Sequence, residues 1–194
     1  MARTSSYMLP LGTVAPQFSL PNTIDGAEVS LESVKGSKGT LVIFMCNHCP
    51  YVLHLLDKII EISEQIRKLG INTVAISSND VDNYPDDRPE LMKKLAEERG
   101  FGFPYLYDES QTTALAYEAA CTPDFYLFDA DLKLVYRGKF DDARPKNDEP
   151  VTGKDLLEGA KKLASEIPQV EDQVPSLGCN IKWKKGNEPA GFFN

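Results

Sequence analysis

Hydrophobic positions change their period along the chain, and these changes predict the order of its elements. Thr40–Met45 is a continuous apolar run, which is typical of a central strand covered on both faces. After Tyr51 the apolar positions step by three and four, which predicts a helix. Its apolar face consists of Val52, Leu55, Ile59, Ile62, Ile66 and Leu69. Gly70 supplies a left-handed residue that ends this helix, and Asn72–Ser77 follows as a second buried strand.

The flanking segments complete an α/β order. Short strands on both sides of Asp25-Gly26 predict a hairpin within residues 14–38. The next predicted elements are a helix over Asp86–Arg99, a strand over Phe103–Tyr107, a helix over Gln111–Tyr117 and strands over Asp124–Phe128 and Lys133–Arg137. Thr152–Asp155 resembles a capping box that opens a last helix, which ends before Pro168. Right-handed crossovers make the first strands parallel, so we expect a mixed sheet between helix layers.

The predicted elements form one domain over residues 1–168, which carries the hairpin as an N-terminal extension. Residues 169–194 show no clear period. We expect them to form a C-terminal tail packed on the domain.

Composition narrows the classes of partner. The chain of 194 residues is 42% hydrophobic and carries a formal net charge of -8, which argues against nucleic acid and anionic membranes as partners. No window approaches the roughly 18 apolar residues of a membrane span, and Met1–Pro10 lacks the apolar core of a signal peptide. We therefore expect a cytoplasmic protein.

Four cysteines carry the candidate chemistry: Cys46, Cys49, Cys121 and Cys179. In a cytoplasmic chain a close pair indicates redox or metal chemistry more than a structural disulfide framework. The segment Cys46-Asn47-His48-Cys49 lies where a buried strand changes to a helix, and the unpaired N–H groups of a helix start favour a thiolate. We expect Cys46 to be the low-pKa, more exposed thiol, Cys49 to close a disulfide with it, and His48 to supply a proton or positive charge.

Other readings of the C-x-x-C spacing stay open. Half of a zinc site has the same spacing, but no second ligand pair accompanies it, so we expect no metal and no cofactor. A purely structural buried pair is the other alternative. His54 is expected to be a surface or core residue rather than a catalytic one. Asp141, Asp142 and Arg144 are expected to form a solvated loop.

Three segments together resemble the thioredoxin superfamily, and within it the peroxiredoxin-like branch of the alkyl hydroperoxide reductase/thiol-specific antioxidant type. They are Leu11–Pro21 followed by Asp25-Gly26, Phe44–Tyr51, and Thr122–Phe125. The resemblance implies a thioredoxin-like α/β fold. It also implies that Thr122-Pro123 is a cis peptide bond and that Pro123 faces the dithiol.

The chain departs from this branch at two positions before Cys49, which aligns with the peroxidatic cysteine. The position of the branch's threonine holds Cys46, and that of its proline holds Val42. The hydroxyl that would orient a peroxide is therefore replaced by a thiol. The resemblance also leaves the proton acceptor for Cys49 unassigned, because Thr40–Met45 lacks the buried acid that thioredoxins carry there.

The sequence thus favours an enzyme, a thiol–disulfide oxidoreductase in which Cys46 attacks and Cys49 resolves. The alternatives are a thiol-dependent peroxidase and a non-enzymatic metal-binding or redox-sensing module. Expected partners are protein or small-molecule disulfides, peroxides for the second function, and a thiol reductant such as a thioredoxin system. Cys121 and Cys179 are candidate accessory thiols; we expect Cys179 to influence reactivity without being required.

Overall fold

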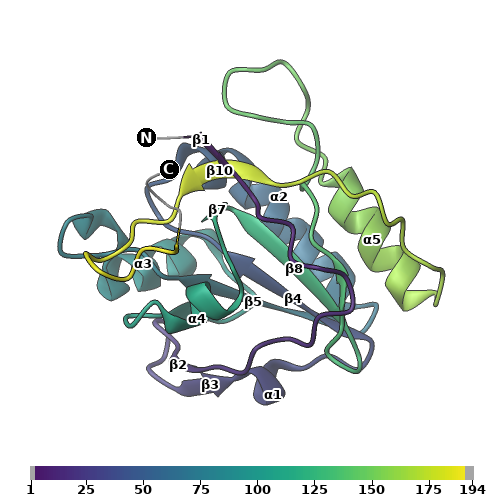
Figure 1. Cartoon of the computed structure of the whole chain (residues 1–194), viewed down its shortest axis with the longest axis horizontal. Coiled ribbons are helices and arrows are strands. Elements are labelled where there is room, and N and C mark those ends of the chain that lie inside the picture. The colour runs from purple at the N-terminus through teal and green to yellow at the C-terminus, as the bar shows by residue number, and fades with distance from the viewer. Residues whose placement is uncertain (1–2, 191–194) are drawn as a thin grey trace.

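The computed structural model describes residues 3–190 and contains a five-stranded mixed sheet in the order β6-β5-β4-β8-β9 (Figure 1). Its strands are β4 (Gly39–Phe44), β5 (Ile71–Ser77), β6 (Tyr105–Tyr107), β8 (Asp124–Asp129) and β9 (Leu134–Tyr136). β4, β5 and β6 run parallel, and β8 pairs antiparallel with both β4 and β9. The mixed sheet predicted from the sequence is confirmed.

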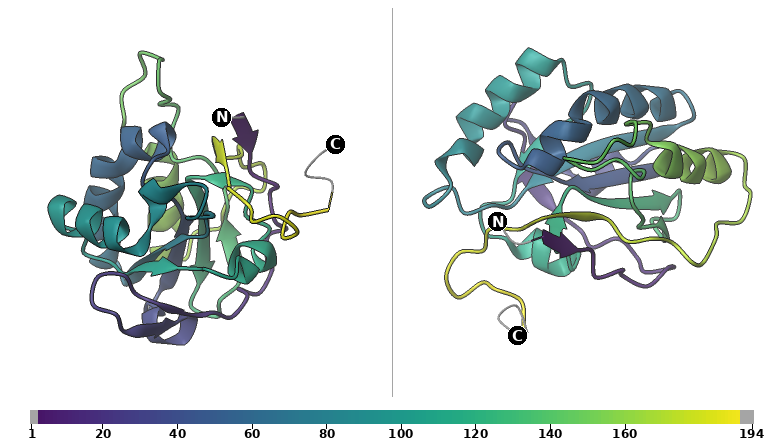
Figure 2. Two further views of the ribbon diagram at one scale, coloured as in Figure 1. Left: turned by 90° about the vertical axis from the view of Figure 1, so that its left-hand side faces the viewer. Right: turned by 90° about the horizontal axis from the view of Figure 1, so that it is seen from above.

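Both faces of the sheet are buried, which explains the continuous apolar run of β4. Leu41 and Ile43 face one core, and Val42 and Phe44 face the other. The first core is covered by α2 (Pro50–Arg67), α3 (Pro89–Arg99) and α5 (Lys154–Ala164). The right-hand view of Figure 2 shows these helices on one side of the sheet and the purple N-terminal segment on the other.

The second face is covered by shorter elements. The predicted hairpin is present as β2 (Ser19–Pro21) and β3 (Glu28–Ser30), which pair antiparallel. α1 (Leu31–Val34) follows the hairpin, and α4 (Thr112–Ala116) lies after β6. Leu31 and Ala114 are fully buried in the second core.

Two local predictions are wrong. The predicted capping box at the start of α5 is absent, because the helix begins at Lys154 behind Gly153, whose φ is 64° and which makes no side-chain cap bond. The carboxylate of Asp141 takes this role by accepting the N–H groups of Thr152 and Gly153, each at 2.6 Å. Asp141, expected in a solvated loop, is 1% exposed for this reason.

The C-terminal segment contains a strand that the sequence pattern does not reveal. β10 (Leu177–Asn180) is the centre of a small sheet in the order β1-β10-β7, where β1 is Arg3–Ser5 and β7 is Cys121–Thr122. Figure 1 shows β10 in yellow beside β1. The two termini of the described chain thus meet over the strand that precedes Pro123. The domain boundary at residue 168 stays a prediction.

Candidate functional site

The dithiol segment joins β4 to α2, and the helix begins later than expected. α2 starts at Pro50, with Cys49 at the N-cap in an extended conformation (φ -71°, ψ 119°). A proline disfavours helical geometry at the preceding residue but fits the first helical position, so the Cys49-Pro50 dipeptide fixes this start. Cys46 lies in the loop before it. The prediction that Cys46 opens the helix is therefore wrong. Both thiols are buried, with Cys46 1% exposed and Cys49 0%.

The sulfur of Cys49 lies in a cluster of polar groups. Its Sγ is 3.1 Å from the carbonyl oxygen of Thr122 and 2.9 Å from the Sγ of Cys179. The pKa of Cys49 is lowered well below its usual value, first because the thiol of Cys179 donates a hydrogen bond to it and next because that of Cys46 does. These donations outweigh burial, which raises the pKa of Cys49.

Cys46 has the opposite character. Its pKa is raised well above the usual value, first because its thiol donates to Cys49, then because of burial and the nearby carboxylate of Asp87. Its Sγ also lies 3.6 Å from the hydroxyl oxygen of Thr122. The pKa shifts of the two sulfurs therefore have opposite directions, with that of Cys49 lowered and that of Cys46 raised. These directions favour Cys49 over Cys46 as the attacking sulfur.

The loop before β8 faces the dithiol, as the resemblance implies. The Thr122-Pro123 peptide bond is cis, and this prediction is confirmed. Thr122, the residue before the proline, contacts both sulfurs, through its hydroxyl toward Cys46 and through its carbonyl oxygen, which accepts from the thiol form of Cys49. Pro123 itself lies next to Cys121, whose Sγ is 3.7 Å from the carbonyl oxygen of Pro123.

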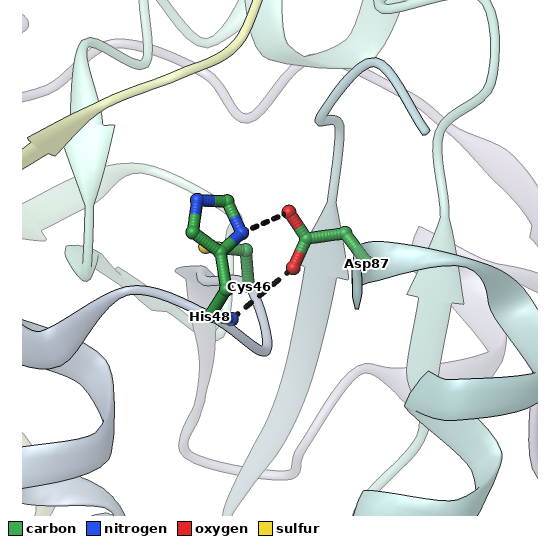
Figure 3. Close-up of side chains that lie close together, drawn as sticks. All are labelled: Cys46, His48 and Asp87. Atoms are coloured by element: carbon green, nitrogen blue, oxygen red, sulfur yellow. Dashed lines mark hydrogen bonds and ion pairs between the residues drawn. The ribbon is translucent and has the colours of Figure 1, made fainter. Parts of the chain in front are cut away.

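A buried carboxylate organises the other side of the segment. Asp87 ends the 3-10 turn Pro85–Asp87, and it accepts a hydrogen bond from the backbone N–H of Asn47 at 2.8 Å. Its Oδ2 lies 2.6 Å from Nδ1 of His48 (Figure 3). Asn79 donates to the same oxygen at 2.8 Å. The contact with Asp87 raises the pKa of His48, and it leaves Nε2 as the free ring nitrogen.

His48 reaches solvent, with 16% of its side chain exposed. Its ring stacks on that of Tyr84, with centroids 5.6 Å apart and 7° between the planes. The Nζ of Lys182 lies 5.6 Å from the centroid of the same tyrosine ring. The segment Tyr84–Asp87, to which the sequence assigned no chemistry, thus holds His48 from two sides.

One group of side chains has the composition of a partial metal site. Ligand atoms of Cys46, His48 and Asp87 lie within 4.8 Å of one another. However, both oxygens of Asp87 already accept hydrogen bonds, from Asn47 and His48 on one side and from His48 and Asn79 on the other. A metal ion would replace these bonds, so the geometry fits a carboxylate–imidazole pair better. The expectation that the site holds no metal stays a prediction.

The site residues named from sequence separate into two groups. Cys46, Cys49 and His48 come together, and Cys179 joins them from the tail. Within residues 3–190, the hydrogen bonds of Cys121 join it to no other sulfur, and burial raises its pKa. His54 is exposed on α2.

Sequence reasoning missed Thr122, Asn79 and Asp87. The Thr122-Pro123 dipeptide was the one available signal, and Asp87 had none, because its turn looks like an ordinary helix entry.

The fold is shared with solved structures. An uncharacterized conserved protein from Geobacillus kaustophilus is 52% identical, with 96% of this chain and 98% of that one covered and a TM-score of 0.94. A hypothetical protein from Sinorhizobium meliloti 1021 is 42% identical, with 94% and 100% covered and a TM-score of 0.92. No curated protein sequence matches the chain significantly.

More distant structures agree in fold. The thioredoxin domain of a thiol-disulfide oxidoreductase from Bacteroides vulgatus has a TM-score of 0.62 at 22% identity, covering 80% of this chain and 99% of that one. The peroxidoxin BcpB from Mycobacterium tuberculosis has a TM-score of 0.60 at 17% identity, covering 79% and 97%. The thioredoxin-like fold expected from the resemblance is confirmed. Among the helices of residues 3–190, none has the length and apolar character needed to cross a bilayer.

The family assignment follows from the sequence match. The profile of the AhpC/TSA family matches residues 11–137, which include the hairpin, the dithiol and the Thr122-Pro123 loop. This chain therefore belongs to the AhpC/TSA family.

Proposed function

We propose that the chain is a thiol–disulfide oxidoreductase that works through the Cys46–Cys49 dithiol, with Cys49 as the attacking thiolate and Cys46 as a resolving thiol. The observation that carries this proposal is that three thiols meet beside the cis Thr122-Pro123 bond, where Thr122 contacts the sulfurs of Cys46 and Cys49 and Cys179 lies 2.9 Å from Cys49. The opposite pKa shifts of Cys46 and Cys49 support their separate roles, since exchange needs one thiolate and one thiol in reach of it. Family membership supports the reaction class.

The proposed cycle begins with attack of the Cys49 thiolate on one sulfur of an external disulfide. The Cys49–substrate bond forms, and the other substrate sulfur leaves as a thiolate. Cys46 then loses its proton and attacks Cys49, which releases the second substrate thiolate and leaves a Cys46–Cys49 disulfide. The substrate gains two electrons and the dithiol loses two. A dithiol reductant of the thioredoxin-system type would restore the starting state.

His48 is placed to handle protons in this cycle. It is partly exposed and its pKa is raised by Asp87. A protonated imidazole beside the reacting sulfurs supplies a proton to a departing thiolate and makes it a better leaving group. Asp87 acts through His48 and is therefore a positioning residue.

The test is reduction of a protein disulfide such as that of insulin, with a dithiol as electron source. We expect turnover by the intact chain, and trapping of a mixed disulfide on Cys49 when Cys46 and Cys179, the two thiols nearest to it, are both replaced by serine. A chain that reacts no faster than the free dithiol reductant would contradict the proposal. It would also leave the redox-sensing or metal-binding module as the better reading.

A thiol-dependent peroxidase is the second candidate, because Cys49 is a thiolate at the N-cap of α2, directly before Pro50. In that reaction the Cys49 thiolate would attack one peroxide oxygen and become a sulfenic acid, while the other oxygen leaves as water or an alcohol. Cys46 would then condense with the sulfenic acid to give a disulfide and water. Rapid peroxide attack also needs donors aimed at the leaving oxygen, and losing one donor costs about 10²–10³ in rate. Cys46 stands where the branch has threonine, so we expect weak peroxidase activity at most.

Peroxide turnover measured beside insulin reduction distinguishes the two enzymes. A peroxide rate far above that of an ordinary thiol, together with slow disulfide exchange, would reverse their order. The cytoplasmic location expected from the sequence stays a prediction.

A further inference from the structure

The tail strand β10 lies directly on the loop that faces the dithiol. β10 pairs antiparallel with β7, and Cys179 is opposite Thr122 in the register. The Sγ of Cys179 is 2.9 Å from that of Cys49, whereas a disulfide bond measures roughly 2.05 Å. The sulfur of Cys49 thus has two thiol neighbours, Cys46 from its own segment and Cys179 from a strand 130 residues away.

The position of Cys179 is fixed by backbone contacts. A Cβ atom at Gly178 would lie 2.0 Å from the carbonyl oxygen of Thr122, so only glycine allows β10 to approach β7 this closely. Beyond the strand, the N–H of Lys182 donates to the side chain of Asn79 at 2.8 Å, and its carbonyl accepts from Gln111 at 2.9 Å. Cys179 is therefore held at the site by a well-anchored strand, and it is 3% exposed.

We infer that Cys179 is a second resolving thiol, so that Cys49 forms two alternative intramolecular disulfides, Cys46–Cys49 and Cys49–Cys179. The inference rests on the proposed function for the identity of the substrate, but pairing of the two sulfurs is independent of it.

Cys49 attacks an external disulfide, forms the mixed disulfide and expels one thiolate. Cys179 gives up its proton and attacks Cys49, which expels the second thiolate and leaves Cys49–Cys179. The external disulfide gains two electrons and the two cysteines lose them. Attack of Cys46 on Cys49 can then move the disulfide to Cys46–Cys49 without net oxidation.

The charge on Cys49 sets the order of these events. The pKa of Cys179 is raised, first because its thiol donates to Cys49 and then by burial. While Cys49 is a thiolate, Cys179 is held as a thiol and does not attack first. Once Cys49 is joined to a substrate sulfur, it no longer carries a negative charge. The Cys179 thiol then loses its proton more readily and can attack.

Cys121 provides the matched control. It lies on β7 and is as deeply buried as the site thiols, but its sulfur contacts the carbonyl of Pro123 rather than Cys49. Gly102 provides the control for Gly178, because a Cβ there meets no atom within 4 Å.

The test uses diamide, which takes two electrons from a pair of thiols and needs no protein substrate. Cys46→Ser and Cys46→Ala variants of the full chain are oxidised, quenched with acid, alkylated and mapped by peptide mass. We expect both to lose two thiols and to give a peptide pair linked by Cys49–Cys179. The same variants carrying Cys179→Ser should not form this pair, whereas those carrying Cys121→Ala should form it as before.

Gly178→Ala, combined with Cys46→Ser, should slow the pairing about 10-fold or more, and Gly102→Ala should leave it unchanged. The inference would be overturned if Cys49 and Cys179 both remain free thiols after diamide treatment of the Cys46→Ser and Cys46→Ala chains. Insulin reduction by the intact chain is measured separately. If the intact chain does not reduce insulin but the Cys49–Cys179 disulfide still forms, the proposed function is wrong and the inference about Cys179 is still supported.

Discussion

The dithiol segment and the tail strand bring thiols to the same sulfur in different ways. In residues 46–49 the two cysteines share one loop, and Pro50 sets where the helix after them begins. In β10 the thiol arrives through strand pairing with β7 and close packing at Gly178. The first arrangement is local and can be read from spacing. The second depends on tertiary contacts, and it places Cys179 nearer to Cys49 than any sequence pattern indicates.

Because Cys46 and Cys179 reach Cys49 in different ways, their roles can be tested separately. If Cys49 is the shared centre, its loss must have the largest effect, and loss of either neighbour must leave the other in place.

Replacing Cys49 by serine should reduce protein-disulfide turnover more than about 100-fold, because the attacking thiolate is removed. Cys46→Ser keeps a hydroxyl donor toward Cys49 and should retain reaction with the first substrate molecule. Insulin reduction measures the first effect, and mixed-disulfide trapping measures the second in chains that also carry Cys179→Ser, so that Cys179 cannot resolve the mixed disulfide. If Cys49→Ser and Cys46→Ser both lose all reaction with the substrate, Cys49 and Cys46 do not have the separate roles of attacking and resolving cysteine.

The protonation of Asp124, next to the loop on which the tail strand lies, should make the stability of the fold depend on pH. Burial raises its pKa to about 6, while hydrogen bonds from Ala120 and Tyr126 oppose the shift. The unfolded chain releases this proton at a lower pH, so stability is lost as pH rises from about 4 to about 6. A shift of this size corresponds to up to about 3 kcal/mol.

The Asp124→Asn variant should lack this loss. Urea unfolding at pH 4.5 and pH 7.5 measures the free energy of unfolding of both proteins. Relative to the wild type, the variant should be more stable at pH 7.5 than at pH 4.5. An unchanged difference between the two proteins at both pH values would show that Asp124 is charged in the folded chain at low pH as well.

The Asp87→Asn variant tests how the carboxylate acts on His48. Without the carboxylate the pKa of His48 should fall toward its usual value, since the contact with Asp87 is the main cause of the increase. NMR titration of the imidazole measures this directly. Turnover near pH 7 should fall about 10-fold, a small general-acid effect. Asp86→Asn, at an exposed neighbouring position, is the matched control and should change neither quantity.

Cys179→Ser should have the smallest effect on turnover, a reduction of a few-fold, because Cys46 still resolves the mixed disulfide. Steady-state insulin reduction beside Cys121→Ala is the measurement. Complete loss of activity in Cys179→Ser would instead make Cys179 the essential resolving thiol and leave Cys46 with a donor role.

Much of the fold could be predicted because its signals are local. The apolar run of β4, the helical period of α2 and the left-handed Gly70, with a φ of 84°, need no distant partner. The start of α2 could also have been predicted, since Cys49-Pro50 places the N-cap at Cys49. The prediction that Cys46 opens the helix was wrong because it followed the strand end and not the proline.

The rest of the site depends on contacts between distant segments. Asp87 meets His48 across 39 residues, and nothing in Tyr84–Asp87 distinguishes that carboxylate from its neighbours. β10 has four residues and includes a glycine, so its strand character comes from pairing with β1 and β7 rather than from its own pattern. The buried role of Asp141 at the start of α5 was hidden for the same reason.

The central claim is that Cys49, and not Cys46, carries the thiolate. Ultraviolet absorbance of thiolate in the reduced chain, followed from about pH 4 to pH 10, tests this most directly when compared with Cys46→Ser and Cys49→Ser. The account predicts that one thiolate is already ionised at pH 6 in the wild type and in Cys46→Ser, and that this signal is absent from Cys49→Ser. A signal that persists in Cys49→Ser and disappears in Cys46→Ser would contradict it.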